Sequence, residues 1–261
     1  MQPDHQVKTI SFVGAGNVGW HLAIALKNAG FRIEFIFSRN QERAHELAAR
    51  TGAMTVRRLD QVASWPDLLI LCFPDDALPE IAMQLNNTPS LVVHTAGSAS
   101  ISVLEGCRGG YGVMYPLQTF TRERRMDYRA IPFLLEADSD ISREKLEFVV
   151  SKISGNFRSA DSRLRLKIHV AAVFACNFSN HMVSLAWKLL TADGVDPEIL
   201  QPLLDETREK QKQMSPMEAQ TGPARRNDKG TMQRHLDLLR EHPELQDIYE
   251  ILSRSLLKMY T

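Results

Sequence analysis

The chain opens with a short apolar run that gives way to a helical pattern across a glycine-rich turn. Residues 7–13 carry the branched and aromatic side chains that favour a buried strand. Residues 20–30 place apolar side chains at helical spacing and end at Gly30, a common helix stop. The pattern therefore predicts a strand, a turn and a helix in direct succession.

The turn between them has the glycine spacing of a dinucleotide-binding motif. Gly14 allows a tight turn, Gly16 lets a pyrophosphate approach the backbone, and Gly19 lets the helix pack close to the strand. The helix N-terminus offers free N–H groups to the phosphates. The alternative, chance glycines in a flexible turn, leaves the flanking strand and helix unexplained. We therefore predict cofactor binding by Gly14, Ala15, Gly16, Asn17, Val18 and Gly19.

The second apolar run, residues 31–37, predicts a strand whose end selects the cofactor. An acidic residue there would bind the ribose hydroxyls of NAD. This chain has Ser38 and Arg39 instead, and a hydroxyl beside a guanidinium suits a phosphate. Glu34 lies four residues too early in the chain to serve as that acid. Arg39 could also be a solvated residue before the next helix. We predict NADP(H) rather than NAD(H).

Further apolar runs alternate with helical patterns along the first half of the chain. The predicted strands are residues 68–73, 91–93, 111–114, 131–135 and 156–158, and a helix is predicted over 41–50. Strands that alternate with helices indicate parallel pairing through helical crossovers. The fold class predicted is α/β, a doubly wound and mostly parallel Rossmann-type sheet followed by an all-helical C-terminal domain.

The carboxyl ends of these strands are the expected ligand site, as in other open α/β sheets. At the first such end, we assign Phe73, Pro74 and Asp75 to the nicotinamide-side ribose. Helix capping is an equally good interpretation of Asp75.

The stretch HTAGS, residues 94–98, follows the next strand and carries small hydrogen-bonding groups. Thr95 is assigned to the cofactor, and an ordinary turn is the alternative for the whole stretch. A substrate carboxylate or carbonyl is assigned to His94, Gly97, Ser98 and, from the following strand end, Gln118.

Strand patterns vanish after about residue 160. A long helix is predicted over 162–190, and shorter helices near 196–214, 229–240 and 244–259. We predict a dinucleotide-binding domain over residues 1–159 and a helical substrate and dimerisation domain over residues 160–261. The segment between them is not rich in Pro or Gly, so tight packing of the two domains is expected.

The long helix is mostly apolar and is expected to be a core element, yet it carries a polar stripe. His169, Cys176, Asn177, Asn180 and Ser184 fall within an arc of about 100°. Burying such groups unpaired costs about 1–3 kcal/mol each, so the stripe is expected to line a cleft or to meet polar partners. Histidine can donate a proton to a carbonyl near neutral pH. We assign His169 and Asn177 to catalysis; pairing within a domain interface is the alternative.

A second candidate for chemistry is the segment GPARRND, residues 222–228. Gly-Pro fixes a turn, and arginine binds carboxylates and phosphates in a bidentate manner. Arg225 and Arg226 are therefore assigned to an anionic substrate. The alternative is a solvated charge run in which Asp228 caps the next helix.

Composition narrows the classes of partner. The chain has 261 residues, 44% apolar and 24% charged, with a net charge of +0. This balance predicts neither a nucleic-acid nor a membrane partner, and no apolar run approaches the roughly 18 residues of a membrane span. The N-terminus lacks an apolar secretory segment. The three cysteines, Cys72, Cys107 and Cys176, form no metal-ligand pair, so we predict a cytoplasmic protein without a metal.

Five stretches of the chain resemble a known family. They are GAGNVG (14–19), HTAGS (94–98), YPLQTF (115–120), HVAAVFACNFSNHM (169–182) and GPARRND (222–228). In layout the chain resembles the β-hydroxyacid dehydrogenase group and its relatives, pyrroline-5-carboxylate reductase and ketopantoate reductase. It is more closely similar to a Rossmann-like family with a C-terminal domain of unknown function, labelled as NADP oxidoreductases of the coenzyme-F420-dependent type.

The resemblance implies an NADP-linked fold, a helical dimerisation domain and a site between the domains. The chain departs from the hydroxyacid dehydrogenases at their catalytic Lys, which precedes an Asn by four residues. Lys167 is followed at that spacing by Ala171. Either His169 and Asn177 take over the role of that pair, or the chemistry differs or is absent.

The sequence as a whole predicts an NADP-dependent oxidoreductase. Hydride would pass between the nicotinamide and a small anionic carbonyl or imine. A dinucleotide-binding sensor or partner protein without turnover is the alternative, and the polar stripe argues against it. No residue favours deazaflavin as co-substrate. We also predict a homodimer through the C-terminal helices, in which the loop carrying Arg225 and Arg226 reaches the partner subunit's cleft.

Overall fold

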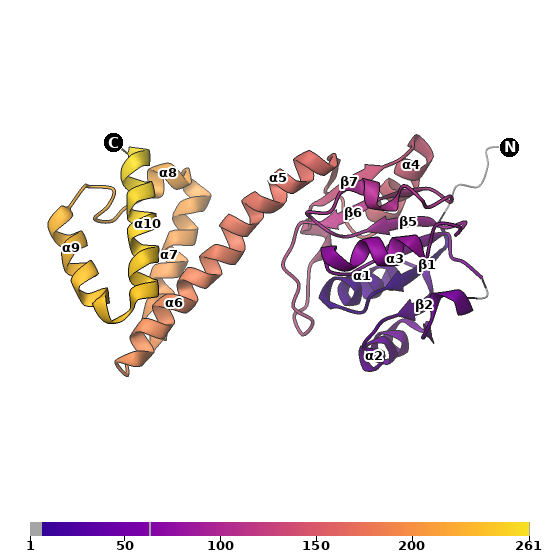
Figure 1. Cartoon of the computed structure of the whole chain (residues 1–261), viewed down its shortest axis with the longest axis horizontal. Coiled ribbons are helices and arrows are strands. Elements are labelled where there is room, and N and C mark those ends of the chain that lie inside the picture. Colours follow the sequence, from indigo (N-terminus) through magenta and orange to yellow (C-terminus); the bar gives the residue numbers. More distant parts are fainter. Residues whose placement is uncertain (1–6, 63, 261) are drawn as a thin grey trace. The chain divides into compact units, whose positions relative to one another are not determined.

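A computed structural model describes residues 7–62 and 64–260 of the chain. It divides into two compact units, residues 1–175 and 176–261 (Figure 1). The boundary between the units falls inside the long helical stretch, whereas the predicted domain boundary at residues 159 and 160 precedes that stretch. The first unit therefore includes the helix that carries His169.

The first unit is built on a sheet whose described strands number eight. The strands are β1 (Thr9–Val13), β2 (Arg32–Phe37), β3 (Met54–Val56), β4 (Leu68–Leu71), β5 (Leu91–His94), β6 (Tyr111–Pro116), β7 (Phe133–Ala137) and β8 (Phe157–Ser159). Their order is β3-β2-β1-β4-β5-β6-β7-β8. Every neighbouring pair is parallel except β6 with β7. The predicted, mostly parallel Rossmann-type sheet is confirmed; the sequence analysis missed β3, which is only three residues long.

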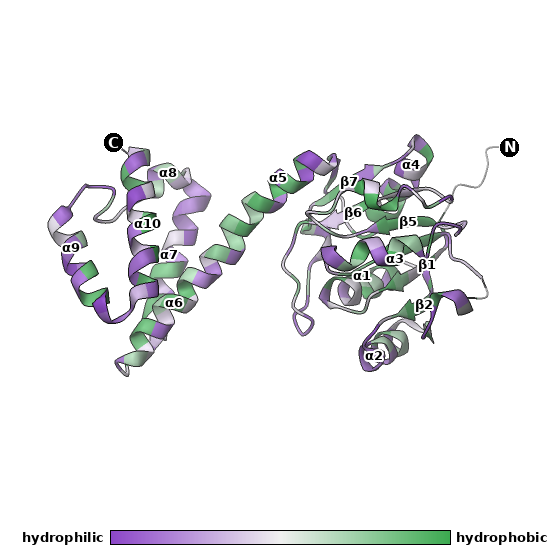
Figure 2. Ribbon diagram, in the orientation of Figure 1, coloured by the Kyte–Doolittle hydropathy of each residue, from purple (hydrophilic) through white to green (hydrophobic). Residues whose placement is uncertain are grey.

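Helices cover both faces of this sheet. They are α1 (Asn17–Asn28), α2 (Gln41–Thr51) and α4 (Asp140–Ser151) on one face and α3 (Leu78–Met83) on the other. Helix α5 (Ser162–Ala172) follows β8, and Arg165 is its buried residue. One core joins Phe12 of β1 to the apolar sides of α1, α2 and α4. The other joins Leu69 of β4 to α3. The central strands are buried on both faces, which is why they read as unbroken apolar runs; β5 shows this in Figure 2.

The second unit is entirely helical over its described residues. A π-helical segment (Val173–Phe178) continues α5 into α6 (Ser179–Ala192), so the predicted long helix is present but changes its hydrogen bonding midway. The remaining α-helices are α7 (Gln201–Gln213), α8 (Pro216–Ala219), α9 (Lys229–Leu238) and α10 (Pro243–Tyr260).

The long helix was expected to be a core element, and this expectation is wrong for the single chain, in which its apolar side chains are exposed. Its apolar side chains Leu166, Val170, Phe174 and Phe178 are 43%, 46%, 65% and 49% exposed. Among the described residues of the second unit, the buried apolar ones are Ala224 and Leu239. Helical periodicity identifies an apolar face, but it does not say whether the covering surface belongs to the same chain.

Candidate functional site

The glycine turn is tightly enclosed by the ends of two strands. Gly14 has a φ of +117°, and a Cβ there would lie 2.2 Å from the carbonyl oxygen of Cys72. A Cβ on Gly19 would lie 2.3 Å from the carbonyl oxygen of Gly14. At Gly16, by contrast, a Cβ would meet no atom within 4 Å, so this position is open to a ligand. The three glycines thus have the geometry that their predicted roles require.

The N-terminus of α1 is suited to phosphate. Gly16 is its N-cap, and no side chain caps the first turn. Free N–H groups at a helix start attract anions. The side chain of Asn17 does not share this role, because its amide donates a 2.9 Å hydrogen bond to the carbonyl oxygen of Phe120. The backbone of Asn17, at the start of α1, stays available for the predicted cofactor contact.

The loop after β6 is fastened onto α1, which the sequence analysis did not anticipate. His21 contacts the Tyr128 hydroxyl through Nδ1 and the carbonyl oxygen of Thr121 through Nε2, each at 2.9 Å. The guanidinium of Arg122 lies 3.6 Å from the centre of the Trp20 ring. These contacts hold the loop beside the phosphate-binding helix. The YPLQTF stretch was the available signal, because it leads directly into this loop.

The end of β2 brings two predicted cofactor residues together. The exposed guanidinium of Arg39 lies 6.0 Å from the centre of the Phe73 ring, which follows β4. Ser38 is buried, and its hydroxyl accepts a 3.2 Å hydrogen bond from the N–H of Asn40. The arginine is therefore placed to meet a ligand, whereas the serine supports the start of α2.

Part of the HTAGS stretch faces inward. His94 is fully buried, and its Nδ1 accepts a hydrogen bond from the N–H of Ala96. Burial, and next the charge of Arg165, lowers the pKa of His94 to about 4. Thr95 is also buried and donates to the carbonyl oxygen of Leu71. Both side chains hold the loop in shape, so direct contacts of His94 with substrate and of Thr95 with cofactor stay predictions.

Gly97, Tyr115 and His169 meet at the carboxyl ends of β5 and β6. The Tyr115 hydroxyl lies 2.9 Å from His169 Nδ1, and the two rings meet edge to face at 78°. A Cβ on Gly97 would lie 2.4 Å from that nitrogen and 3.0 Å from Tyr115 Cζ. The pair exists in this form because residue 97 has no side chain. Tyr115 was not among the predicted site residues.

A second polar contact joins the ends of β4 and β5. The Ser98 hydroxyl donates a hydrogen bond to Asp75 Oδ2. Burial, and next the negative charge of Asp75, raises the pKa of the Tyr115 hydroxyl. The phenol therefore keeps its proton at neutral pH. A carboxylate, a hydroxyl, a phenol and an imidazole are thus gathered around Gly97.

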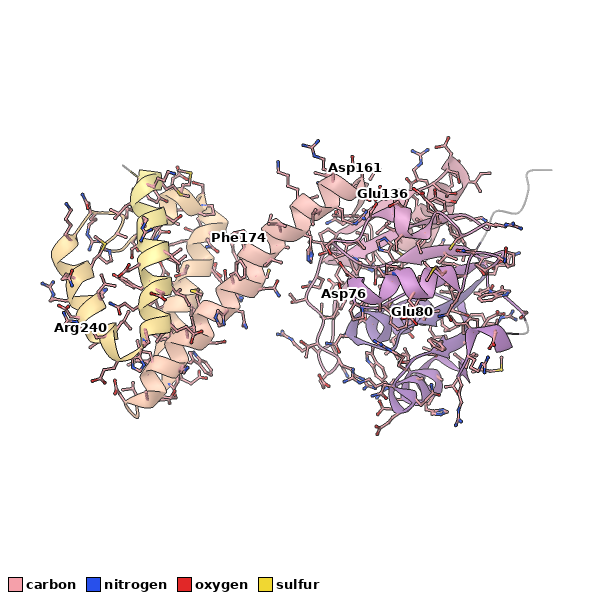
Figure 3. All side chains as sticks on the ribbon, in the orientation of Figure 1. Asp76, Glu80, Glu136, Asp161, Phe174 and Arg240 are labelled. Atoms are coloured by element: carbon pink, nitrogen blue, oxygen red, sulfur yellow. The ribbon has the colours of Figure 1, made fainter. Side chains whose placement is uncertain are left out.

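A buried ion pair anchors α5, which carries His169. Arg165 has no exposed surface, pairs with Glu136 of β7 and donates to the carbonyl oxygen of Ala99. Ser162 donates to the same carboxylate. Glu136 lies at the N-terminal end of α5, near the capping residue Asp161 (Figure 3). This pair could not be predicted from the sequence, because nothing local to either residue marks it.

Of the remaining predicted residues, Asn177, Arg225 and Arg226 belong to the second unit, and Gln118 binds its own neighbour. Asn177 is exposed in the π-helical segment of the second unit. Arg225 stacks 4.6 Å over the ring of Tyr260, while Arg226 is exposed. Gln118 accepts a hydrogen bond from the N–H of Thr119. Their catalytic and substrate roles stay predictions.

Residues within the loop that carries the two arginines determine its backbone conformation. Gly222 and Asn227 have φ values of +107° and +53°. Asp228 caps α9 by accepting from the N–H of Thr231, as the alternative interpretation of this segment predicted.

Over residues 7–62 and 64–260, no three His, Cys, Asp or Glu side chains are gathered as a metal ion requires. No helix in that same part of the chain is long and apolar enough to cross a membrane.

Comparison with known proteins places the chain among redox proteins. Residues 9–97 match the family described as NADP oxidoreductase, coenzyme F420-dependent, and residues 131–256 match a domain of unknown function, DUF2520. No curated protein was found to match the chain.

Solved structures match the chain over nearly its full length. A candidate NADP oxidoreductase from Bacteroides fragilis is 40% identical, with a TM-score of 0.91 over 97% of this chain and 99% of that one. A protein from Thermotoga maritima is 24% identical, with a TM-score of 0.72 over 96% and 98%. An imine reductase from Myxococcus stipitatus in complex with NADP+ shares the fold at 16% identity, with a TM-score of 0.65 over 96% and 94%.

The resemblance noted in the sequence is thereby confirmed. The chain belongs to the family that joins a Rossmann-type domain of the NADP oxidoreductase, coenzyme F420-dependent class to a C-terminal DUF2520 domain.

Proposed function

We propose that this protein is an NADP-dependent oxidoreductase that transfers a hydride between nicotinamide and a small anionic carbonyl or imine. One observation carries the proposal: the Tyr115–His169 pair lies at the strand ends of the same unit that holds the glycine turn. In this fold, the strand ends are where a dinucleotide is bound. This position supports the proposal, because a group able to exchange a proton would then lie beside the bound nicotinamide.

The residues around the glycine turn fit a dinucleotide. Gly16 is open for backbone contact, and the uncapped start of α1 would hold the pyrophosphate. Arg39 would bind the 2′-phosphate that distinguishes NADP from NAD. Phe73, beneath its guanidinium, gives that side chain a fixed neighbour. The family description supports the same choice of cofactor.

When bound, the nicotinamide supplies or accepts the hydride, and the protein positions the reactants and moves the proton. His169 would give a proton to the substrate oxygen or nitrogen during reduction and take it back during oxidation. Asp75 and Ser98 border the same place and would orient the substrate or the ribose. Asn177 would hold a substrate oxygen.

An anionic substrate is proposed from the arginine loop. Arg225 is engaged with Tyr260, so Arg226 is the better candidate for the carboxylate contact. Arginine suits a carboxylate because its planar fork can donate two parallel hydrogen bonds. We place this protein in the cytoplasm on the grounds of its cysteine count.

A titration with NADPH and with NADH, followed by nicotinamide fluorescence, tests the cofactor. We expect tighter binding of NADPH, and an Arg39→Ala variant that loses this preference. Arg32→Ala is the matched control, because Arg32 is an exposed arginine at the other end of β2. Equal and weak binding of both nucleotides would contradict the assignment of Arg39. No binding of either would contradict the proposed function.

The alternative, a dinucleotide-binding sensor without turnover, predicts binding but no reaction. A screen of small keto acids and imines, monitored by NADPH oxidation, separates the two. Turnover with any of them, lost in His169→Gln, supports the enzyme. Tight NADPH binding without turnover across the screen would favour the sensor.

We also propose a homodimer formed through the C-terminal helices. Leu166, Val170, Phe174 and Phe178 recur every four residues and are all 43% or more exposed. Such spacing places them along one face of the helix. A second copy of the chain would cover this apolar face and would bring its Arg226 loop to the first copy's site.

A further inference from the structure

The described residues contain three Tyr–His pairs that share the same contact between a phenol and a ring nitrogen. The pairs are His21–Tyr128, Tyr115–His169 and His235–Tyr249, and each joins the phenol to Nδ1 at 2.9 Å. The pairs differ in whether Nε2, the other ring nitrogen of the histidine, also has a hydrogen-bond partner. Nε2 of His21 contacts the carbonyl oxygen of Thr121, so both of its nitrogens serve the protein.

His169 differs from His21 at that second nitrogen. Over residues 7–62 and 64–260, Nδ1 of His169 is held by Tyr115, and Nε2 has no hydrogen-bond partner. The ring is half-buried against Gly97, where a Cβ would clash. One nitrogen is therefore fixed by the fold, and the other is available to a ligand.

The direction of the bond follows from the partners of the phenol. Within the same ranges of the chain, His169 Nδ1 is the hydrogen-bond partner of the Tyr115 hydroxyl. The phenol keeps its proton at neutral pH, because burial raises its pKa, and it can donate that proton to Nδ1. A neutral imidazole that accepts at Nδ1 carries its own proton on Nε2.

We propose that Tyr115 is a positioning residue that fixes His169 in the Nε2–H tautomer and supplies the proton that His169 delivers. This inference rests on the proposed function. During reduction, hydride forms the new C–H bond, and the substrate oxygen or nitrogen takes the proton of Nε2. The Tyr115 O–H bond breaks as its proton moves to Nδ1, so the ring stays neutral. A proton from water then adds to Nε2, and the Nδ1 proton returns to the phenolate, which restores the starting tautomer.

This arrangement suits a reduction because a developing alkoxide or amide ion is a much stronger base than a phenolate. The charged groups near the pair have opposite effects on the pKa of the Tyr115 hydroxyl. Asp75, beyond β4, disfavours the phenolate, whereas Arg165 of α5 favours it. Arg165 is itself paired with Glu136 of β7, and His94 of β5, with a pKa of about 4, is neutral at physiological pH.

The tautomer can be tested without a substrate, by NMR of the full protein labelled with ¹⁵N-histidine. We expect Nε2 of His169 to be protonated at neutral pH, and Nδ1 to be unprotonated and shifted by the bond that it accepts. Tyr115→Phe should abolish that shift. Tyr128→Phe, which removes the matched bond at His21, should leave the His169 resonances unchanged. A protonated Nδ1 in the wild type, or identical His169 resonances in Tyr115→Phe, would overturn the proposal.

The proton source is tested by the pH profile of a reduction found in the keto-acid and imine screen. Because the phenol is the source, we expect the wild-type kcat to vary less than about twofold between about pH 6 and pH 8. Tyr115→Phe lacks this proton source, so its kcat should vary with pH over a range in which the wild-type kcat does not. Identical profiles would overturn the relay. If NADPH fails to bind, the proposed function falls, while the NMR result still decides the role of Tyr115.

Discussion

Arg165 of α5 and Glu136 of β7 form an ion pair in which the guanidinium is fully buried and the carboxylate is 15% exposed. The same guanidinium donates to the carbonyl oxygen of Ala99, in the loop that carries Gly97. One buried cation therefore holds together β7, the strand-end loop and α5. His169 lies one helical turn beyond it. The pair thus fixes the position of the candidate proton-transfer group.

Removal of the Glu136 charge should lower the free energy of unfolding. Glu136→Gln leaves Arg165 buried without its counter-ion, and breaking a buried pair in this way costs about 3–5 kcal/mol. Asp140→Asn is the control, because it breaks the exposed pair of Asp140 with Arg143, which is worth about 1 kcal/mol or less. Urea unfolding of both variants measures the two losses. A loss below about 1 kcal/mol for Glu136→Gln would show that the pair does not anchor α5.

A methyl group at position 97 should separate the proposed pair. In Gly97→Ala the new Cβ would lie 2.4 Å from His169 Nδ1, so the ring has to move away from Tyr115. We expect the NMR signature of the Nδ1 hydrogen bond to be lost and turnover to fall about 100-fold, because misplacement by about 1 Å has that effect. Gly155→Ala is the control, since a Cβ there meets nothing within 4 Å. An unchanged His169 spectrum in Gly97→Ala would refute the close contact.

Features formed by contiguous residues could be predicted from the sequence, whereas contacts between residues far apart in the chain could not. The glycine turn and its flanking strand and helix are contiguous, so their pattern was sufficient to predict the dinucleotide-binding fold. Tyr115 and His169 are separated by 54 residues, and Arg165 and Glu136 by 29. Each of these side chains has an ordinary surface interpretation when it is considered alone. Only the packing of α5 against the strand ends brings them together.

His169 itself was predicted, because polarity on an apolar helix is a local signal. Its partner was not predicted, because a tyrosine at a strand end has many structural uses. The inward orientation of His94 could not be predicted either, because a position at the end of a strand does not determine on which side of the loop the ring lies. Burial at such positions depends on contacts that are distant in the sequence.

The buried His94 should make the protein less stable in acid. Its folded pKa of about 4 lies below the ordinary 6.5, so the unfolded chain binds more protons between these values. The stabilisation is therefore complete above about pH 6.5 and is lost as the pH falls through 4, by about 3 kcal/mol in total. Urea unfolding from pH 7 to pH 4 should show this slope, and His94→Asn should reduce it.

The control for this slope is His45→Asn, because His45 is an exposed histidine of α2. That variant should keep the wild-type dependence on pH. An equal slope in wild type and His94→Asn would mean that other groups govern the acid sensitivity.

The exposed apolar face of the long helix should make the protein self-associate. If a second copy covers Val170, which is 46% exposed, the wild type should sediment at twice the chain mass of 29.5 kDa. Val170→Glu would place a charge in that interface and should shift the protein to monomers, because burying an unpaired carboxylate is strongly unfavourable. Ile141→Glu is the control, as Ile141 is 50% exposed on α4 of the first unit. A wild type that stays monomeric at every concentration would contradict the dimer and would remove the route by which Arg226 could reach a partner's site.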